Sequence, residues 1–353
     1  MMIPIAIDYL GATKYGIWIT VFSVLMWVRI LDVGLGNGLR NRVAEAIAKE
    51  DIQMAKMYIS TTYLIVSVIM VSAFVIFIIV YPYVDWIKIF NAPDELRSEI
   101  GLMVLTVFCL ICLRFIFQLI FNLCQANQEP AFCELIDAST ALLSLLAIII
   151  ISQTTSSSLI YFALAVSIAP IAVLVLFHIY LFSTKYKIYL PSIRFVDFSH
   201  AKSLTRLGIN FFIIQIASLI LFSTSNFLIT YLFSPQEVTK VHVANSYFNI
   251  LLMFFLLMVS PLWSAVTDAY HKGDLVWIKS VVQKLLKYWF IVVFLAAIML
   301  AVSSVFYSVW IGDRIHIPFS VTLVVALLRL YSEFPTAEYA KYQAGYAFYP
   351  DFK

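Results

Sequence analysis

The run Tyr58–Tyr81, which reads YISTTYLIVSVIMVSAFVIFIIVY, decides the fold class of this chain. It contains no charged residue, and about 20 mostly apolar residues are enough to cross the roughly 30 Å hydrocarbon core of a bilayer. Because lipid offers no hydrogen-bond partners, the backbone of such a run must satisfy its own N–H and C=O groups, which favours a helix. The run therefore predicts a membrane-spanning helix.

The same pattern recurs along most of the 353 residues. Hydrophobic residues make up 63% of the chain and charged residues 12%, against roughly 25% charged residues in a soluble domain. We expect an all-α polytopic membrane protein, a helical bundle with about 9–10 spans. The other full spans are predicted near Tyr15–Leu31, Ile100–Leu123, Leu135–Ile151, Ser158–Phe182, Leu207–Phe233, Tyr247–Val266 and Tyr288–Ile311, and partial spans at Met1–Leu10 and Ile317–Leu330.

Lysine and arginine fall unevenly in the loops between these spans, which predicts the orientation of the chain in the membrane. Alternate loops hold fourteen of them: Arg29, Arg40, Arg42, Lys49, Lys56, Lys185, Lys187, Arg194, Lys202, Arg206, Lys272, Lys279, Lys284 and Lys287. The opposite loops hold five: Lys14, Lys88, Arg97, Lys240 and Arg314. Since cytoplasmic loops are enriched in Lys and Arg, the richer side is predicted to face the cytoplasm.

A glycine-rich stretch, DVGLGNGLRNRVAEA at Asp32–Ala46, follows the second of these segments. Gly34, Gly36 and Gly38 would permit a tight bend or a close helix approach where the chain leaves the membrane. Arg40 and Arg42 would then meet anionic headgroups, and Val43, Ile47 and Met54 would line one face of an interfacial helix. A phosphate-binding nucleotide loop is disfavoured, because it requires a preceding soluble strand.

The stretch also carries a family resemblance. Together with YLGATKYGIW at Tyr9–Trp18, YLFSPQEVT at Tyr231–Thr239 and PLWSAVTDAY at Pro261–Tyr270, it resembles the O-antigen flippase-like, polysaccharide-biosynthesis branch of the multidrug/oligosaccharidyl-lipid/polysaccharide exporter superfamily. The resemblance implies a two-lobed bundle of 12–14 spans around a central cavity that works by alternating access. Gly34, Gly36, Gly38, Arg40, Asn41 and Asp268 are its family-motif positions here.

Relative to that pattern, the chain lacks the start of the first span and everything beyond about the tenth, so we expect a piece of a longer transporter. An N-terminal lobe is predicted at 1–182, a cytoplasmic inter-lobe loop at 183–206 and a partial C-terminal lobe at 207–330. The Tyr- and Ala-rich tail at 331–353 is unlike the rest of the chain.

Polar residues within spans are costly unless they face protein or water, so they indicate candidate site residues. Arg114, Gln118, Asn122 and Gln125 recur at intervals that place them on one stripe, about 80° wide, of a helix. One interpretation is a cavity lining whose cation attracts a pyrophosphate-linked or acidic glycan. The other is an internal tie of Arg114 to a carboxylate or to backbone carbonyls.

Three further groups of polar residues can each be interpreted as functional or as structural. Asn210, Gln215 and Asn226, with Ser218 and Ser225, share one face of the predicted span at 207–233, where they would line the cavity or bond neighbouring helices. Glu134 and Asp137 could partner the Arg114 stripe, although their position better fits a helix N-terminus. Asp268, His271 and Asp274 are interpreted as solvated charges at a span end rather than a proton relay.

The sequence predicts a transporter that is not an enzyme. It has no catalytic signature, no metal-ligand spacing among its five histidines and no sign of a cofactor, and Cys109 and Cys112 read as small apolar packing residues. The net charge of +3 does not suggest nucleic acid. The resemblance implies a multi-pass protein of the bacterial inner membrane that flips a lipid-linked oligosaccharide, with membrane lipids and glycan-assembly proteins as partners.

Two other functions compete with this one. A multidrug antiporter of the same superfamily would need an acidic, ion-coupled site within the membrane. A membrane glycan polymerase or ligase would need large outer loops with catalytic Arg or His, and the outer loops predicted here are short.

Overall fold

The computed structural model describes residues 2–32, 34–198, 216, 224–271 and 274–331. These residues form helices and connecting turns and contain no strand. Six of the helices are long and apolar enough to cross a membrane: Met2–Val28, Ile52–Tyr83, Asp94–Ala126, Pro130–Thr154, Leu159–Ser183 and Lys279–Trp310. The predicted all-α polytopic membrane fold is therefore confirmed. The chain contacts divide it into two compact units, Met1–Val238 and Thr239–Lys353.

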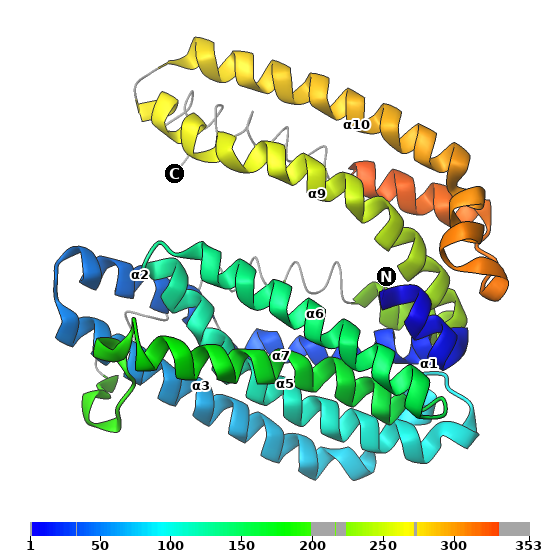
Figure 1. Cartoon of the computed structure of the whole chain (residues 1–353), viewed down its shortest axis with the longest axis horizontal. Coiled ribbons are helices and arrows are strands. Elements are labelled where there is room, and N and C mark those ends of the chain that lie inside the picture. Colours follow the sequence, from blue (N-terminus) through cyan, green and yellow to red (C-terminus); the bar gives the residue numbers. More distant parts are fainter. Residues whose placement is uncertain (1, 33, 199–215, 217–223, 272–273, 332–353) are drawn as a thin grey trace. The chain divides into compact units, whose positions relative to one another are not determined.

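The first unit is a bundle of long helices, with the shorter helix α2 at one end (Figure 1). Its helix α5 packs against α2, α3 and α7, and α6 packs against α7. Because one helix contacts three others, α5 is the central element of the bundle. The α-helices described between residues 2 and 198 are α1 (Met2–Leu25), α2 (Leu35–Ala48), α3 (Ile52–Val80), α4 (Trp86–Ile89), α5 (Arg97–Ala126), α6 (Pro130–Thr154) and α7 (Leu159–Ser183). Residues 224–232 are helical as well.

Helix α1 is interrupted at Gly11, whose φ of 73° and ψ of 167° are not helical. A positive φ is open to glycine at little cost and strains other residues, so the glycine permits this break. The break separates the two segments that the sequence predicts, Met1–Leu10 and Tyr15–Leu31. The second segment is shorter as an α-helix than predicted, because the chain tightens into a 3₁₀ helix at Met26–Asp32.

The long helices expose large apolar side chains on their outer faces. In α3 these include Val71, Val75, Ile76 and Ile79, which are 50–62% exposed. A water-soluble protein would expose contiguous apolar surface of this kind only at an interaction site. With the bilayer as solvent, such side chains face lipid, which explains why the charged fraction is so low.

The loops gather at two ends of the first unit. At one end, which we call the outer end, Lys14 Nζ lies 3.6 Å from a Glu99 carboxylate oxygen and donates to the Ser157 carbonyl at 3.0 Å. At the other, inner end, the Ser192 amide donates to Ser60 Oγ at 3.0 Å. The described parts of the two Lys/Arg-rich loops of this unit meet at the inner end, where Lys56 Nζ lies 4.6 Å from the centre of the Phe195 ring. Within this unit the loops are therefore grouped as the charge asymmetry requires.

The second unit contains α9 (Pro235–His271, which starts in the first unit), α10 (Leu275–Trp310), a 3₁₀ turn at Gly312–Arg314 and the short helix Phe319–Tyr331. Tyr247 joins its helices: the ring stacks on Phe306 with centroids 4.5 Å apart, and the hydroxyl donates to the Met299 carbonyl at 3.0 Å. The predicted spans Tyr247–Val266 and Tyr288–Ile311 lie within α9 and α10.

Two other predicted segments lie largely outside the residues that the structure describes. Most of the predicted span Leu207–Phe233 and nearly all of the tail 331–353 lie outside the described residues. The lobe boundaries at 182 and 206 therefore stay predictions.

Candidate functional site

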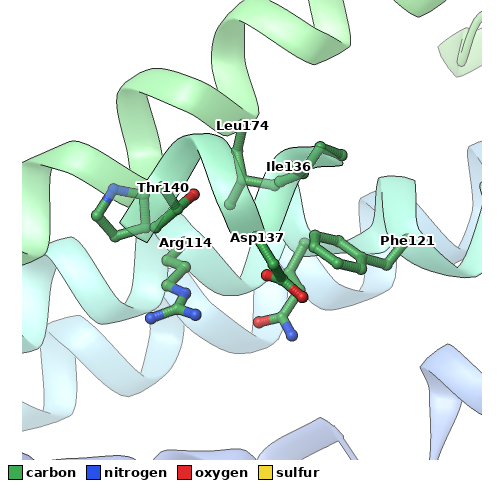
Figure 2. A pocket seen from close by; sticks show the side chains of 8 residues that line it. Arg114, Phe121, Ile136, Asp137, Thr140 and Leu174 are labelled. Atoms are coloured by element: carbon green, nitrogen blue, oxygen red, sulfur yellow. The ribbon is translucent and has the colours of Figure 1, made fainter. Parts of the chain in front are cut away.

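A pocket of about 330 Å³ opens among α5, α6 and α7 in the first unit. Figure 2 shows Arg114 of α5 and Asp137 of α6 with their charged ends on the same side of the pocket, beside Phe121 and Thr140. The lining residues are Arg114, Gln118, Phe121, Ile136, Asp137, Thr140, Pro170 and Leu174. Two of the four residues of the predicted α5 stripe, Arg114 and Gln118, thus lie in one cavity, whereas Asn122 and Gln125 are not among its lining residues.

The pocket lies within the inner half of the bundle. Helix α5 ends at Ala126, so at 1.5 Å per residue Arg114 lies roughly 18 Å from that end. Asp137 lies roughly 10 Å along α6 from its start at Pro130 by the same rise. The pocket thus lies away from the helix ends, at a depth where an unpaired charge is costly.

Arg114 and Asp137 interact electrostatically across the pocket. The Arg114 side chain is half-buried, whereas Asp137 is exposed to the pocket. Attraction between opposite charges strengthens as the local dielectric constant falls, so the pair stabilises two charges that would otherwise be costly at this depth. The pocket therefore presents one cation and one carboxylate to any ligand.

The preference for Glu134 and Asp137 as helix-capping residues is wrong. Helix α6 begins at Pro130 rather than near Leu135, and its first turn contains no acidic residue. Proline is favoured at the first helical position because its missing N–H has no helical partner there, which starts the helix earlier than its apolar run suggests. Glu134 is exposed, and Asp137, one turn further along, lines the pocket.

The third stripe residue, Asn122, lies outside the pocket and contacts the glycine-rich stretch. A Cβ built on Gly36 would lie 2.9 Å from Asn122 Nδ2, so a larger residue at this position requires the Asn122 side chain to shift. Gly34 precedes α2 with φ 73° and ψ 12°, in the left-handed region. The stretch thus contains both a bend and a close approach.

The remaining family-motif residues of α2 lie on opposite faces. Gly38 is buried, whereas Arg40 and Asn41 are exposed, with Arg40 placed for contact with solvent or headgroups. The predicted apolar face needs correction, because α2 ends at Ala48 and Met54 belongs to α3. The buried positions are Leu35, Gly36, Gly38, Leu39, Val43 and Ala46.

Asn226 takes part in polar contacts between α1 and the segment 226–236. Its Nδ2 donates to Ser23 Oγ at 2.8 Å, Thr20 and Thr230 share a buried hydroxyl hydrogen bond, and Gln236 Nε2 donates to Thr13 Oγ1 at 2.8 Å. We call these three contacts the outer seam. Along the outer seam, the residue numbers in the segment fall from 236 to 226 while those in α1 rise from 13 to 23. The two segments therefore run antiparallel.

Other predicted residues fall outside what the structure describes. Asn210 and Gln215 lie in the undescribed range 199–215, and Asp268 is placed within α9 without a described side chain. Among the described residues, no three His, Cys, Asp or Glu side chains form a group that could hold a metal ion.

The inner end is held by a charged contact between two loops. Glu129, between α5 and α6, forms an ion pair with Lys185, and the Tyr186 hydroxyl donates to Glu129 Oε2 at 2.7 Å. Burial alone would raise the pKa of Glu129, but the hydrogen bonds from Lys185 and Tyr186 lower it below its ordinary value. The contact ties the α5–α6 turn to the chain that leaves α7.

Sequence reasoning missed half of the pocket. Thr140 lies one turn after Asp137 on α6, and that spacing would have placed both on one helix face. Pro170, inside α7, marks an interruption of the helical hydrogen bonds that a mid-span proline always causes. Phe121, Ile136 and Leu174 carry no sequence signal, because apolar residues fill every span.

Comparisons with known proteins agree with this architecture. The chain is 23% identical, over 74% of its length, to a Salmonella typhi protein that is named as an O-antigen transporter, and it spans 59% of the length of that relative. An inward-facing multidrug resistance MATE family transporter of the MOP superfamily matches with a TM-score of 0.78 at 14% identity, over 97% of this chain and 79% of that one. A MATE structure in the bent conformation matches with a TM-score of 0.56 at 18% identity, over 98% and 80%.

No family model matches the chain. The solved structures show that the fold is that of the MATE transporters of the MOP superfamily. Together with the relative, they confirm the resemblance found in the sequence.

Proposed function

We propose that this chain moves a lipid-linked oligosaccharide across the bacterial inner membrane as a flippase in cell-surface polysaccharide assembly. The observation that carries the proposal is the pocket of Arg114 and Gln118 within a MATE-type bundle that matches an O-antigen transporter over 74% of this chain. The proposed partners are the lipid-linked oligosaccharide, the surrounding lipids and glycan-assembly proteins.

The physical difficulty in this reaction is the polar head of the substrate. Its hydroxyl and phosphate groups lose their hydrogen bonds to water when they enter the hydrocarbon core, which costs several kcal/mol per unsatisfied group. A translocation surface lowers this cost by supplying replacement partners. Arg114, Gln118, Asp137 and Thr140 are such partners, and they lie on helices at membrane depth.

The lipid tail needs no such surface, because it stays in the bilayer throughout. The exposed apolar faces of α3 and its neighbours are compatible with a tail that remains among the lipids. On this proposal the protein has to bind only the head group, and a polar pocket in the inner half of the bundle supports that role.

A second candidate is export of cationic small molecules, as the MATE neighbours suggest. The observation that favours it is Asp137, a carboxylate in the pocket that could bind a cation. The interaction of Asp137 with Arg114 works against this role, because the arginine charge repels a second cation.

The proposal is tested in proteoliposomes that hold the purified chain and a fluorescent undecaprenyl-pyrophosphate oligosaccharide in the inner leaflet. Flipping exposes the label to a membrane-impermeant quencher, and we expect faster exposure than in protein-free vesicles. A parallel set of vesicles measures transport of ethidium. Ethidium transport without oligosaccharide flipping would replace the proposal by the multidrug function.

A further inference from the structure

We propose that the pocket of Arg114, Gln118, Asp137 and Thr140 binds an uncharged sugar ring of the carried oligosaccharide rather than its diphosphate. This inference rests on the proposed function and identifies which part of the substrate the pocket contacts. It also revises the interpretation of Arg114 as a pyrophosphate-binding cation.

The charges of the pocket oppose a diphosphate. The diphosphate that joins the lipid to the sugar is esterified at both ends and carries two negative charges, and Asp137 places a carboxylate on the same surface as Arg114. Like charges repel more strongly in a low-dielectric setting than in water, so Asp137 offsets much of the attraction that Arg114 offers to an anion. A site for a diphosphate would have a net positive charge, whereas Arg114 and Asp137 together are neutral.

The hydrogen-bonding groups match a sugar. Each sugar hydroxyl both donates and accepts, so a sugar site needs both kinds of group. Arg114 supplies donors only, an ionised Asp137 acceptors only, and Gln118 and Thr140 supply both. The oxygens of a fully ionised diphosphate only accept hydrogen bonds, which would leave the Asp137 carboxylate without a donor from the ligand.

One apolar residue of the lining suits the other surface of a sugar ring. Of Phe121, Ile136, Pro170 and Leu174, only Phe121 is partly exposed, and its ring can contact the C–H face of a pyranose. Pro170 is buried, and Ile136 and Leu174 are only 1% and 2% exposed, so these three pack beneath the lining rather than face a ligand.

The size of the pocket fits a single sugar ring. Its volume of about 330 Å³ lies near the lower end of the roughly 300–1,000 Å³ found for ligand pockets. Such a cavity accommodates a small ring rather than a whole oligosaccharide with its lipid. The pocket therefore recognises one part of the head group, and the remaining sugars extend beyond it.

The experiment measures binding of two small probes to the purified full chain by saturation-transfer NMR. The probes are uncharged methyl glycosides of hexoses and N-acetylhexosamines, and inorganic pyrophosphate. We expect a methyl glycoside to bind and pyrophosphate not to displace it. Asp137→Asn and Thr140→Val should each weaken sugar binding about tenfold, since the first replaces a charged acceptor by a weaker neutral amide and the second removes a hydroxyl.

Glu95→Gln is the control, because it neutralises an exposed carboxylate at the outer end of the unit, away from the pocket. It should leave sugar binding unchanged. Sugar binding that none of the pocket substitutions weakens would overturn the inference. Binding of pyrophosphate at Arg114 would also overturn the inference, if Asp137→Asn makes that binding tighter.

Failure of the inference differs from failure of the proposed function. If the proteoliposomes flip the labelled lipid while the pocket binds no sugar, only the inference is wrong. If they do not flip it and the pocket still binds sugar, the proposed function is wrong and the sugar site stands.

Discussion

The side-chain nitrogen Nδ2 of Asn122 on α5 lies so close to Gly36 on α2 that a Cβ on the glycine would lie 2.9 Å from it. The contact joins two features that lie far apart in the sequence, the glycine-rich stretch and the polar stripe of α5. Because α2 starts at the inner end and α5 reaches that end at Ala126, the contact fixes α2 against the bundle.

The effect of a Gly36 substitution on stability should therefore depend on the residue at position 122. Gly36→Ala gains about 1 kcal/mol of helix propensity but forces the Asn122 side chain to move, and overpacking of this kind costs about 1–3 kcal/mol. We expect a net loss of stability in the wild-type background. In an Asn122→Ala background the clash is absent, so the same substitution should stabilise the protein by about 1 kcal/mol.

Thermal unfolding of the four purified variants in detergent measures this coupling as a double-mutant cycle. Asn41→Ala serves as the control, because Asn41 is exposed on the same helix. Equal effects of Gly36→Ala in both backgrounds would show that the close approach is unimportant for stability.

The outer seam makes a prediction about transport. Thr20 and Thr230 are fully buried and share a hydroxyl hydrogen bond, so their Cβ atoms are close to the separation of about 3.5–4.5 Å that a disulfide needs. In a variant without the four native cysteines, Thr20→Cys with Thr230→Cys should cross-link on mild oxidation. We expect the cross-link to stop transport and reduction to restore it, since alternating access requires helices on one side to separate.

The measurement combines a gel assay of cross-linking with the flipping assay, before and after reduction. Each single cysteine variant is the control for oxidation itself. If the cross-linked protein transports at the unlinked rate, the seam stays closed throughout the cycle.

The sequence predicted the fold much more fully than the site. Long apolar runs and the loop charges are local signals, and they were sufficient for the membrane fold and for most spans. The pocket depends on which faces of α5, α6 and α7 meet, and periodicity within one helix cannot supply that. Arg114 and Gln118 were found because charge and amide groups stand out in a span, whereas Asp137 was misread because α6 begins at Pro130, earlier than its apolar run.

The Glu129 contact predicts how stability changes with pH. Because the folded state lowers the pKa of Glu129, its stabilising contribution is present above the ordinary glutamate pKa of about 4.3 and is lost as the pH falls through the lowered value. Glu129 is partly exposed, so we expect Glu129→Gln to cost no more than about 1 kcal/mol at neutral pH. The difference from wild type should shrink in acid.

Unfolding temperatures of both proteins between neutral pH and about pH 3 measure this change. Glu95→Gln is the control, since Glu95 is an exposed carboxylate at the outer end. A wild-type advantage that grows in acid would contradict the assigned contact.

The orientation prediction uses the two ends of the first unit. Ser157 lies at the outer end beside Lys14, and Lys187 follows α7 at the inner end. In intact cells, a cysteine-free protein with Ser157→Cys should react with a membrane-impermeant maleimide. The protein with Lys187→Cys should react only after the cells are opened. The reverse pattern would overturn the Lys/Arg assignment.

Substitutions of Arg114 distinguish a contact with the substrate from an internal interaction with Asp137. Arg114→Lys keeps the charge but loses the planar fork of donors, so we expect partial transport. Arg114→Ala removes charged hydrogen bonds worth about 1.5–3 kcal/mol, and transport should fall by about tenfold or more. That variant also leaves the Asp137 carboxylate without its opposite charge, which could by itself lower the amount of protein in the membrane.

The double variant Arg114→Ala with Asp137→Asn separates the two effects. Asp137→Asn alone is the reference, because Asp137 is itself proposed to contact the substrate. If Arg114 only balances Asp137, the double variant should accumulate and transport like Asp137→Asn. If Arg114 binds substrate, the double variant should accumulate like Asp137→Asn and transport less. The measurement is flipping of the labelled lipid, normalised to protein in the vesicles, and equal transport by the double variant and Asp137→Asn would remove Arg114 from the substrate site.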